Sequence, residues 1–217
     1  MFKGARMSYN RTRWPGAVGA AGARFPDVCA MNVRIEELKQ GSQEAFGALV
    51  AECSRRVIST CHGLLGSRED AEDVAQEVFV EVYRSIRRFR KDADLNTWIY
   101  RIAINKSLDL VRKRKRKKRI SDLRGLFGAK AKPIESPHQR LEAKERKEIL
   151  QEQIALLAEN QRIALVLSQY EKLSNKEISL IMAASETAVE SLLHRARANL
   201  RKQLSVYFEE NPPPPAG

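Results

Sequence analysis

The chain is short of the residues on which several classes of protein depend, beginning with cysteine. It has three cysteines in 217 residues, Cys29, Cys53 and Cys61, and no Cys-x-x-Cys pair. Cys53 and Cys61 stand eight residues apart on a predicted helix, too far along its axis to share a metal or a disulfide. We therefore expect buried thiols in a reducing compartment.

Long apolar runs are also missing from the sequence. No run approaches the roughly 20 residues that a membrane-spanning helix requires, and residues 1–30 lack the continuous apolar core of a signal peptide. We expect no membrane insertion and a cytoplasmic location. Residues 1–30 are predicted to be a disordered extension, with Met31 as an alternative start.

Glycine and proline are sparse between Met31 and Tyr207, and the alternating β-branched residues of strands are missing. With 6% aromatic and 30% charged residues, the composition suits small helical modules better than an enzyme with a deep pocket. We predict an all-α fold of two small helical domains joined by a flexible linker, the second of them a helix-turn-helix. We expect no enzymatic activity and no cofactor.

What the chain does have is a net excess of positive charge, and this excess comes from two stretches. Of the formal net charge of +12, eight charges come from the basic run Arg112–Arg119 and four from residues 1–30, while the remainder is balanced. A block of like charge this dense is typical of nucleic-acid-binding segments, although a merely solvated helix end has the same composition.

The helix expected after Ser67 has the clearest periodicity. Ser67–Asp70 resembles a capping box, and apolar residues then recur at every third or fourth position. The predicted inner stripe is Ala71, Val74, Ala75, Val78, Phe79, Val82, Tyr83 and Ile86. Further helices are expected over residues 35–39, 43–65 and 95–118. In the last of these we expect Leu95, Ile99, Ile102 and Ala103 to face inward and Arg101, Asn105 and Arg112 to face outward.

The outer face of the helix after Ser67 is acidic, and three interpretations compete. Asp73 and Glu77 lie four residues apart and could chelate a metal, but the histidines, His62, His138 and His194, all lie outside this helix. We predict no metal site. Simple solvation would also account for the charge. Because DNA would repel such a face, contact with a basic protein partner is the interpretation we favour.

The segment Arg88–Asn105 mixes basic, aromatic and amide side chains. Such a mixture suits single-stranded nucleic acid, because each ring that stacks on a base contributes about 1–3 kcal/mol while cations follow the backbone. Trp98 is equally well explained as a core residue beside Ile99 and Ile102.

Helical periodicity disappears over residues 120–137, which hold two glycines and two prolines, and this segment is predicted to be the linker. Helices are then expected over residues 141–158 and 160–169. Ser174–Glu177 matches a capping box that opens a helix through Met182. Ala183 and Ala184 form a tight turn, and Ser185 caps the last helix.

The short helix, turn and longer helix follow the helix-turn-helix pattern, with a hairpin that touches only protein as the alternative. The inner stripe of the last helix is predicted to be Val189, Leu192, Leu193 and Ala196. Basic side chains placed to reach phosphates are Arg195, Arg197, Arg201 and Lys202.

Two long motifs resemble one family. DAEDVAQEVFVEVYRSIRRFRKDADLNTWIYRIAINKSLDLVRKRKR is similar to the sigma-2 domain of the bacterial RNA polymerase sigma factors of the extracytoplasmic function (ECF) group, the small two-domain members of the sigma-70 family. LLAENQRIALVLSQYEKLSNKEISLIMAASETAVESLLHRARANLRKQL is similar to their sigma-4 domain. The resemblance covers residues 35–204 in the family's order.

The resemblance implies a transcription initiation factor that binds core RNA polymerase and promoter DNA, with an anti-sigma factor as a further partner. It assigns polymerase binding to Asp70, Asp73, Gln76 and Glu77. It assigns the −10 element to Phe89, Asn96, Thr97, Trp98, Arg101, Asn105 and Lys106. It assigns the −35 element to Ser185, Glu186, Thr187, Ala188, Glu190, Ser191, His194, Arg195 and Arg197. The sigma-2-like domain is expected over residues 31–119, the linker over 120–138, the sigma-4-like domain over 139–208 and a disordered tail over 209–217.

The chain departs from the family pattern at Glu190 and Leu192, where basic side chains are usual. Glu190 would repel phosphate but could accept a hydrogen bond from a cytosine amine. Either the −35 sequence is unusual, or this domain binds DNA weakly and depends on the polymerase. The basic run Arg112–Arg119 is longer than the family needs and is expected to add non-specific, salt-sensitive DNA affinity.

Two rival functions fit parts of the pattern. A stand-alone helix-turn-helix regulator would form a stable homodimer and bind duplex DNA without polymerase. A carboxylate metal enzyme on the acidic helix is disfavoured by the positions of the histidines.

Overall fold

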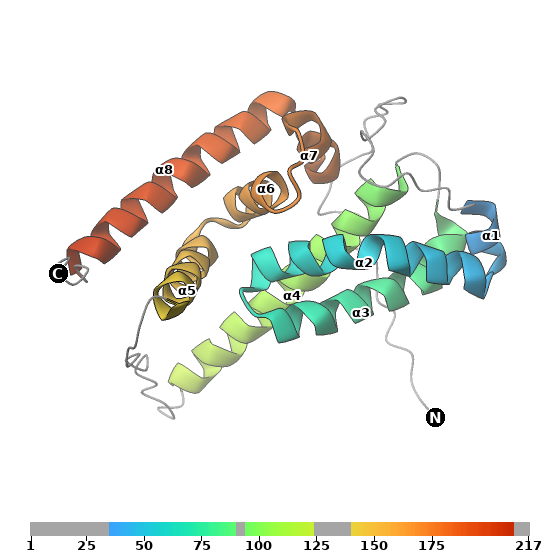
Figure 1. Cartoon of the computed structure of the whole chain (residues 1–217), viewed down its shortest axis with the longest axis horizontal. Coiled ribbons are helices and arrows are strands. Elements are labelled where there is room, and N and C mark those ends of the chain that lie inside the picture. The colour runs from blue at the N-terminus through green and yellow to red at the C-terminus, as the bar shows by residue number, and fades with distance from the viewer. Residues whose placement is uncertain (1–34, 90–93, 124–139, 211–217) are drawn as a thin grey trace.

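The computed structural model describes residues 35–89, 94–123 and 140–210, and all of its regular secondary structure is helical (Figure 1). The predicted extension 1–30, most of the linker and the end of the tail lie outside these residues. The helices are α1 (Ile35–Gln40), α2 (Gln43–Leu65), α3 (Arg68–Ser85), the 3-10 turn η1 (Ile86–Arg88), α4 (Leu95–Leu123), α5 (Arg140–Leu156), α6 (Glu159–Gln169), α7 (Asn175–Met182) and α8 (Glu186–Glu210). The predicted all-α fold is confirmed.

Serine side chains begin several helices, because the first backbone N–H groups of a helix have no partner within it. The capping box at Ser174 is complete: the Ser174 N–H donates to Glu177 Oε2 at 2.7 Å, and the Glu177 N–H donates to Ser174 Oγ at 3.3 Å. At Ser67 the hydroxyl accepts from the Asp70 N–H at 3.3 Å. The Asp70 carboxylate instead accepts hydrogen bonds from Arg114 of α4.

The first core lies between α2, α3 and α4 (Figure 1). The predicted inner stripe of α3 is buried there except for Tyr83, which is 49% exposed and packs edge-on against Phe46. Placing Tyr83 inside was therefore wrong. Cys53 and Cys61 are both buried, as predicted, and burial raises the pKa of the Cys61 thiol to about 11.

The helix-turn-helix is formed by α7 and α8, and α6 completes its core. Ala183 adopts the left-handed region, with φ of +50°, and produces the tight turn predicted between the two helices. The inner residues Val189, Leu193 and Ala196 are buried as predicted, whereas Leu192 is half-buried.

The two halves pack directly against one another, which sequence reasoning did not predict. The second core combines Leu64 of α2 and Tyr100, Ile104 and Leu108 of α4 with apolar residues of α6, α7 and α8. The helix α4 also runs to Leu123, beyond the predicted end at Lys118. No helix in the described ranges is long and apolar enough to cross a membrane.

Two valines of α3 test this packing. Val82 is fully buried and Val80 is 47% exposed. We expect Val82→Ala to lower the free energy of unfolding by about 2 kcal/mol, since it leaves a cavity, and Val80→Ala to change it by less than about 0.5 kcal/mol. Urea unfolding followed by circular dichroism measures both. Equal losses from the two variants would contradict the assigned inner face.

Candidate functional site

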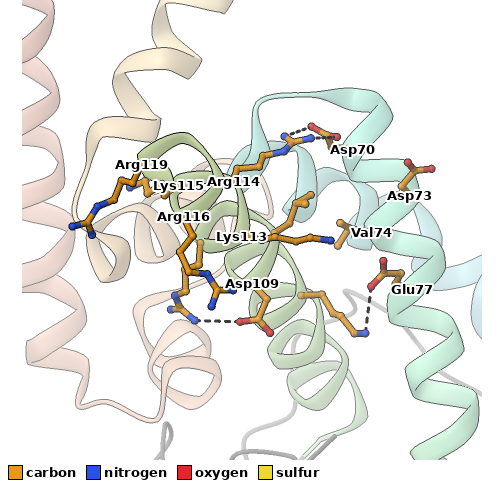
Figure 2. A pocket seen from close by; sticks show the side chains of 13 residues that line it. Asp70, Asp73, Val74, Glu77, Asp109, Lys113, Arg114, Lys115, Arg116 and Arg119 are labelled. Atoms are coloured by element: carbon orange, nitrogen blue, oxygen red, sulfur yellow. Dashed lines mark hydrogen bonds and ion pairs between the residues drawn. The ribbon is translucent and has the colours of Figure 1, made fainter. Parts of the chain in front are cut away.

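The predicted polymerase-binding residues lie along one side of α3. Asp73, Gln76 and Glu77 are exposed, and Asp70, one turn earlier, is partly covered. Figure 2 shows Asp70, Asp73 and Glu77 following α3 opposite the basic end of α4. The structure thus brings all four predicted residues onto one helix beside the basic run.

Two of these acids form ion pairs with α4. The Arg114 guanidinium donates to both oxygens of Asp70, at 2.5 and 2.6 Å, and Lys106 Nζ lies 3.4 Å from Glu77 Oε2. The hydrogen bonds from Arg114 hold the pKa of the Asp70 carboxyl below its usual range. The acidic face is therefore partly neutralised by the chain's own cations, a relation that sequence reasoning missed.

A groove separates the acidic helix from the basic one (Figure 2). Its residues are Asp70, Asp73, Val74, Glu77, Lys106, Asp109, Leu110, Arg112, Lys113, Arg114, Lys115, Arg116 and Arg119. The wall from α3 is mostly acidic and the wall from α4 is mostly basic, so the groove suits a protein partner that carries both signs of charge. Across the described residues, no three His, Cys, Asp or Glu side chains gather closely enough to hold a metal ion.

The predicted −10 segment continues into α4, whose start at Leu95 was predicted, but sequence reasoning missed the cap that begins this helix. Asp94 Oδ2 accepts hydrogen bonds from the Asn96 and Thr97 N–H groups at 2.9 and 3.4 Å and caps α4. An aspartate ahead of an apolar-periodic stretch is the available signal. The cap positions Trp98 at the end of the first turn.

The aromatic pair of this segment lies at the edge of the first core. The Phe89 side chain is buried, and its ring centroid lies 5.1 Å from that of the half-buried Trp98. Thr97 is buried, and Asn96 is half-buried. Trp98 thus packs against the first core, as one of its two interpretations predicted, and part of its side chain stays exposed.

The outward placement predicted for Arg101 and Arg112 was wrong. Arg101 donates to the backbone carbonyls of Leu180 and Ile181, at 2.7 and 3.1 Å, and Arg112 donates to both oxygens of Glu159 at 2.6 Å. Asn105 is half-buried on the same helix. Two arginines expected in solvent therefore join the halves of the molecule.

The start of α8 presents an open polar face. The predicted −35 residues Ser185, Glu186, Thr187, Ala188, Glu190, Ser191, His194, Arg195 and Arg197 are all exposed. Ser185 Oγ accepts from the Ala188 N–H at 3.1 Å and caps the helix, and Asn175 Nδ2 lies 3.5 Å from Glu190 Oε1. The residues lie where a helix-turn-helix meets the major groove.

Sequence reasoning also missed Glu171, which lies between α6 and α7. Burial raises the pKa of this carboxyl, and Tyr100 Oη donates to its Oε2 at 3.1 Å. Glu171 stands in a loop without periodicity, so its burial left no pattern to detect.

Family models match both halves of the chain: Sigma-70 region 2 over residues 49–117, and Sigma-70 region 4 over residues 147–200. These two regions, in this order, define a sigma factor of the sigma-70 type. Among curated relatives, the ECF RNA polymerase sigma factor SigW of Bacillus subtilis is 32% identical over 79% of this chain and 95% of its own length. The ECF RNA polymerase sigma-E factor of Escherichia coli is 32% identical over 76% of this chain and 89% of its own.

Solved structures share the fold. CnrH, in complex with the cytosolic domain of CnrY, has a TM-score of 0.59 and 23% identity over 79% of this chain and 95% of its own. The sigma factor RpoE of Bartonella quintana, in complex with the anti-sigma factor NepR, has a TM-score of 0.55 and 21% identity over 75% of this chain and 98% of its own. With the sequence matches above, the chain belongs to the ECF sigma factors, and it is a transcription initiation factor.

The pair Asp70–Arg114 gives a test of the site's electrostatics. We expect Arg114→Ala to raise the pKa of Asp70 toward the ordinary carboxyl value of about 3.9. At neutral pH the lost stability should stay below about 1 kcal/mol, since solvent screens this half-exposed pair. The pKa of Asp70 is lower in the folded chain than in the unfolded chain, so the ion pair stabilises the fold at pH values above the ordinary carboxyl pKa. This contribution is lost as the pH falls through the pKa that Asp70 has in the folded chain.

NMR titration of the Asp70 carboxyl and urea unfolding between pH 2 and pH 7 measure these effects. Lys117→Ala is the control, since it removes one charge from the same run without removing the partner of Asp70. An identical pKa of Asp70 in wild type and Arg114→Ala would contradict the ion pair.

Proposed function

We propose that this chain binds core RNA polymerase and directs it to promoters, reading and melting the −10 element with residues 89–106 and reading the −35 element with α8. The observation that carries this proposal is the presence of one exposed acidic face on α3 and one exposed polar face on the helix-turn-helix within a single ECF sigma factor. The first suits a basic protein surface and the second suits duplex DNA.

Polymerase binding is assigned to α3. Asp73 and Gln76 are exposed at the centre of the predicted face, and Asp70 and Glu77 flank them. A polymerase surface carrying cations would compete with Arg114 and Lys106 for the two flanking carboxylates. Asp73 therefore provides the charge that is most accessible to a partner.

The −10 element is assigned to the start of α4 and the residues around it. The exposed part of Trp98 offers a stacking surface for an unpaired base, worth about 1–3 kcal/mol, against the few kcal/mol that base flipping costs. Arg101, Asn105 and Lys106 follow on the same helix and would contact the strand. The buried Phe89 ring packs against the Trp98 ring in a tilted arrangement.

The −35 element is assigned to the N-terminal half of α8. The side chains of Ser185, Thr187 and Ser191 would donate to or accept from base edges, and Arg195 and Arg197 would reach phosphates. Glu190, beside Asn175, would accept from a cytosine amine. This acceptor would favour a promoter with a cytosine at the base pair that it meets.

The sigma-2-like domain is assigned to residues 31–119 and the sigma-4-like domain to residues 139–208, with the linker 120–138 between them. Two relatives of known structure bind the partners named CnrY and NepR, the latter an anti-sigma factor, which supports an anti-sigma protein as a partner here. The assigned role is non-enzymatic and cytoplasmic. A stand-alone regulator would bind duplex DNA equally well with and without core polymerase.

Charge reversal at Asp73 tests the polymerase interface. We expect Asp73→Lys to weaken binding to core RNA polymerase at least tenfold, because it places a cation against a basic surface. Binding of the purified chain to core enzyme is measured by fluorescence anisotropy, together with multiple-round transcription from its promoter. Glu44→Lys, an exposed reversal on α2, is the control. Normal core binding by Asp73→Lys would refute the assignment of α3.

Loss of the stacking surface at Trp98 tests the −10 assignment. We expect Trp98→Ala to lower promoter opening about tenfold or more while core binding stays within about twofold, since only the melted strand loses a contact. Permanganate footprinting and the anisotropy assay measure the two effects, and Trp98→Phe should recover part of the opening. Equal loss of opening and core binding would show that Trp98 serves the fold instead.

A further inference from the structure

The basic run Arg112–Arg119 at the end of α4 supplies eight positive charges and has no role in the proposed function. Three of its side chains, those of Lys113, Arg116 and Lys117, are exposed and stand three or four residues apart. Residues at this spacing share one face of a helix. A row of cations on an open helix face suits the phosphates of nucleic acid.

Arg114 belongs to the same run, but its guanidinium is turned toward α3. It donates to both oxygens of Asp70, at 2.5 and 2.6 Å, and Figure 2 shows the side chain reaching from α4 to Asp70. Charge-assisted bidentate bonds of this kind are the strong ones. The carboxylate neutralises the guanidinium and would repel a phosphate brought up to it. Arg114 therefore binds DNA well only after it leaves Asp70.

A second ion pair repeats this arrangement about two turns along both helices. Lys106 Nζ lies 3.4 Å from Glu77 Oε2. Glu77 follows Asp70 by seven residues, and Lys106 precedes Arg114 by eight, as expected for two helices that run in opposite directions. In both pairs an acid assigned to polymerase binds a cation of α4. The two surfaces are therefore connected by the pairing of α3 with α4.

We propose that the basic run is a phosphate-binding surface for duplex DNA, and that Asp70 withholds Arg114 from it until core polymerase binds α3. The inference rests on the proposed function, which assigns Asp70 to polymerase, and adds a role for the basic run. A polymerase cation that pairs with Asp70 displaces Arg114. The freed guanidinium stands three residues before Lys117 and extends the exposed row of cations.

Duplex DNA is the nucleic acid that this surface fits. The basic run holds no aromatic side chain on which an unpaired base could stack, whereas a duplex presents one phosphate charge for about every 1.7 Å of its axis. Phosphate contacts carry no sequence information, so this surface adds affinity and leaves the choice of promoter to other residues.

The connection between the two surfaces is reciprocal. If polymerase binding releases Arg114 and so raises the affinity for DNA, DNA binding raises the affinity for polymerase by the same factor. The pair is half-exposed, with 54% of the Arg114 side chain open to solvent. Since exposed ion pairs are weak, we expect a factor of about two to five.

Duplex binding by the free chain tests whether Arg114 is withheld. The full-length protein is titrated into a short labelled duplex of random sequence at several low salt concentrations, and fluorescence anisotropy is recorded. We expect Asp70→Ala to tighten binding about two- to fivefold. The slope of log K against log salt should become steeper by about 0.9, because one more cation meets a phosphate.

Asp73→Ala is the matched control, since it removes the same charge from the same helix while the partner of Arg114 stays in place. It should tighten binding by less than about twofold, through screened charge alone, and leave the salt slope unchanged. In a chain that carries Arg114→Ala, the gain from Asp70→Ala should fall to that of the control. Equal gains from Asp70→Ala and Asp73→Ala, or a gain that persists without Arg114, would overturn the proposal.

Promoter binding in the presence of saturating core polymerase tests the release. We expect Arg114→Ala to weaken binding of a promoter duplex about two to five times more in the holoenzyme than in the free chain. Lys117→Ala, which removes a side chain that is already exposed in the free chain, should show no such difference. Equal losses from Arg114→Ala with and without core polymerase would contradict the release.

The failure of this inference and the failure of the proposed function have different signatures. The random-duplex measurements contain no polymerase, so a negative result there removes the withheld Arg114 and leaves the proposed function intact. Normal core binding by Asp73→Lys would instead remove the assignment of α3 to polymerase, and with it the trigger for release.

Discussion

The helix α4 is buried on two sides, and both halves of the molecule depend on it. Ile99, Ile102 and Ala103 pack into the core shared with α2 and α3. Tyr100, Ile104 and Leu108 pack into the second core, against α6, α7 and α8. A surface helix normally carries one apolar stripe, so a helix with two stripes must lie between two layers. This constraint places the segment proposed to bind the −10 element within reach of the helix-turn-helix.

Much of the fold follows from local signals in the sequence. The stripe of α3, the serine caps and the turn at Ala183 each depend on residues within one or two turns, and each lies where it was predicted. The misplacement of Tyr83 has a simple cause, because its position on the helix fits the stripe while its ring reaches the surface beside Phe46.

The contacts between the halves were harder to predict because they join residues far apart in the chain. Arg101 and Leu180 are separated by 79 residues, and Arg112 and Glu159 by 47. The apolar residues Tyr100, Ile104 and Leu108 were the available indication of a second buried face. The pairing of Asp70 with Arg114 could not be predicted either. A charged residue on a helix surface can face solvent, contact a partner protein or form an ion pair, and the sequence pattern is the same in all three cases. The residues of the candidate site were identified through the family resemblance, while their present partners came from the structure.

Because α4 is continuous from Leu95 to Leu123, it fixes the distances between the side chains that it carries. Trp98 and the first arginine of the basic run stand fourteen residues apart, which corresponds to about 21 Å along a helix rising 1.5 Å per residue. Nucleic acid that touches both must span that interval, equal to about six steps of a duplex at 3.4 Å each. Under the proposed function, the spacing between a base stacked on Trp98 and phosphates bound by the basic run would therefore be set by helix geometry, whatever the DNA sequence between them.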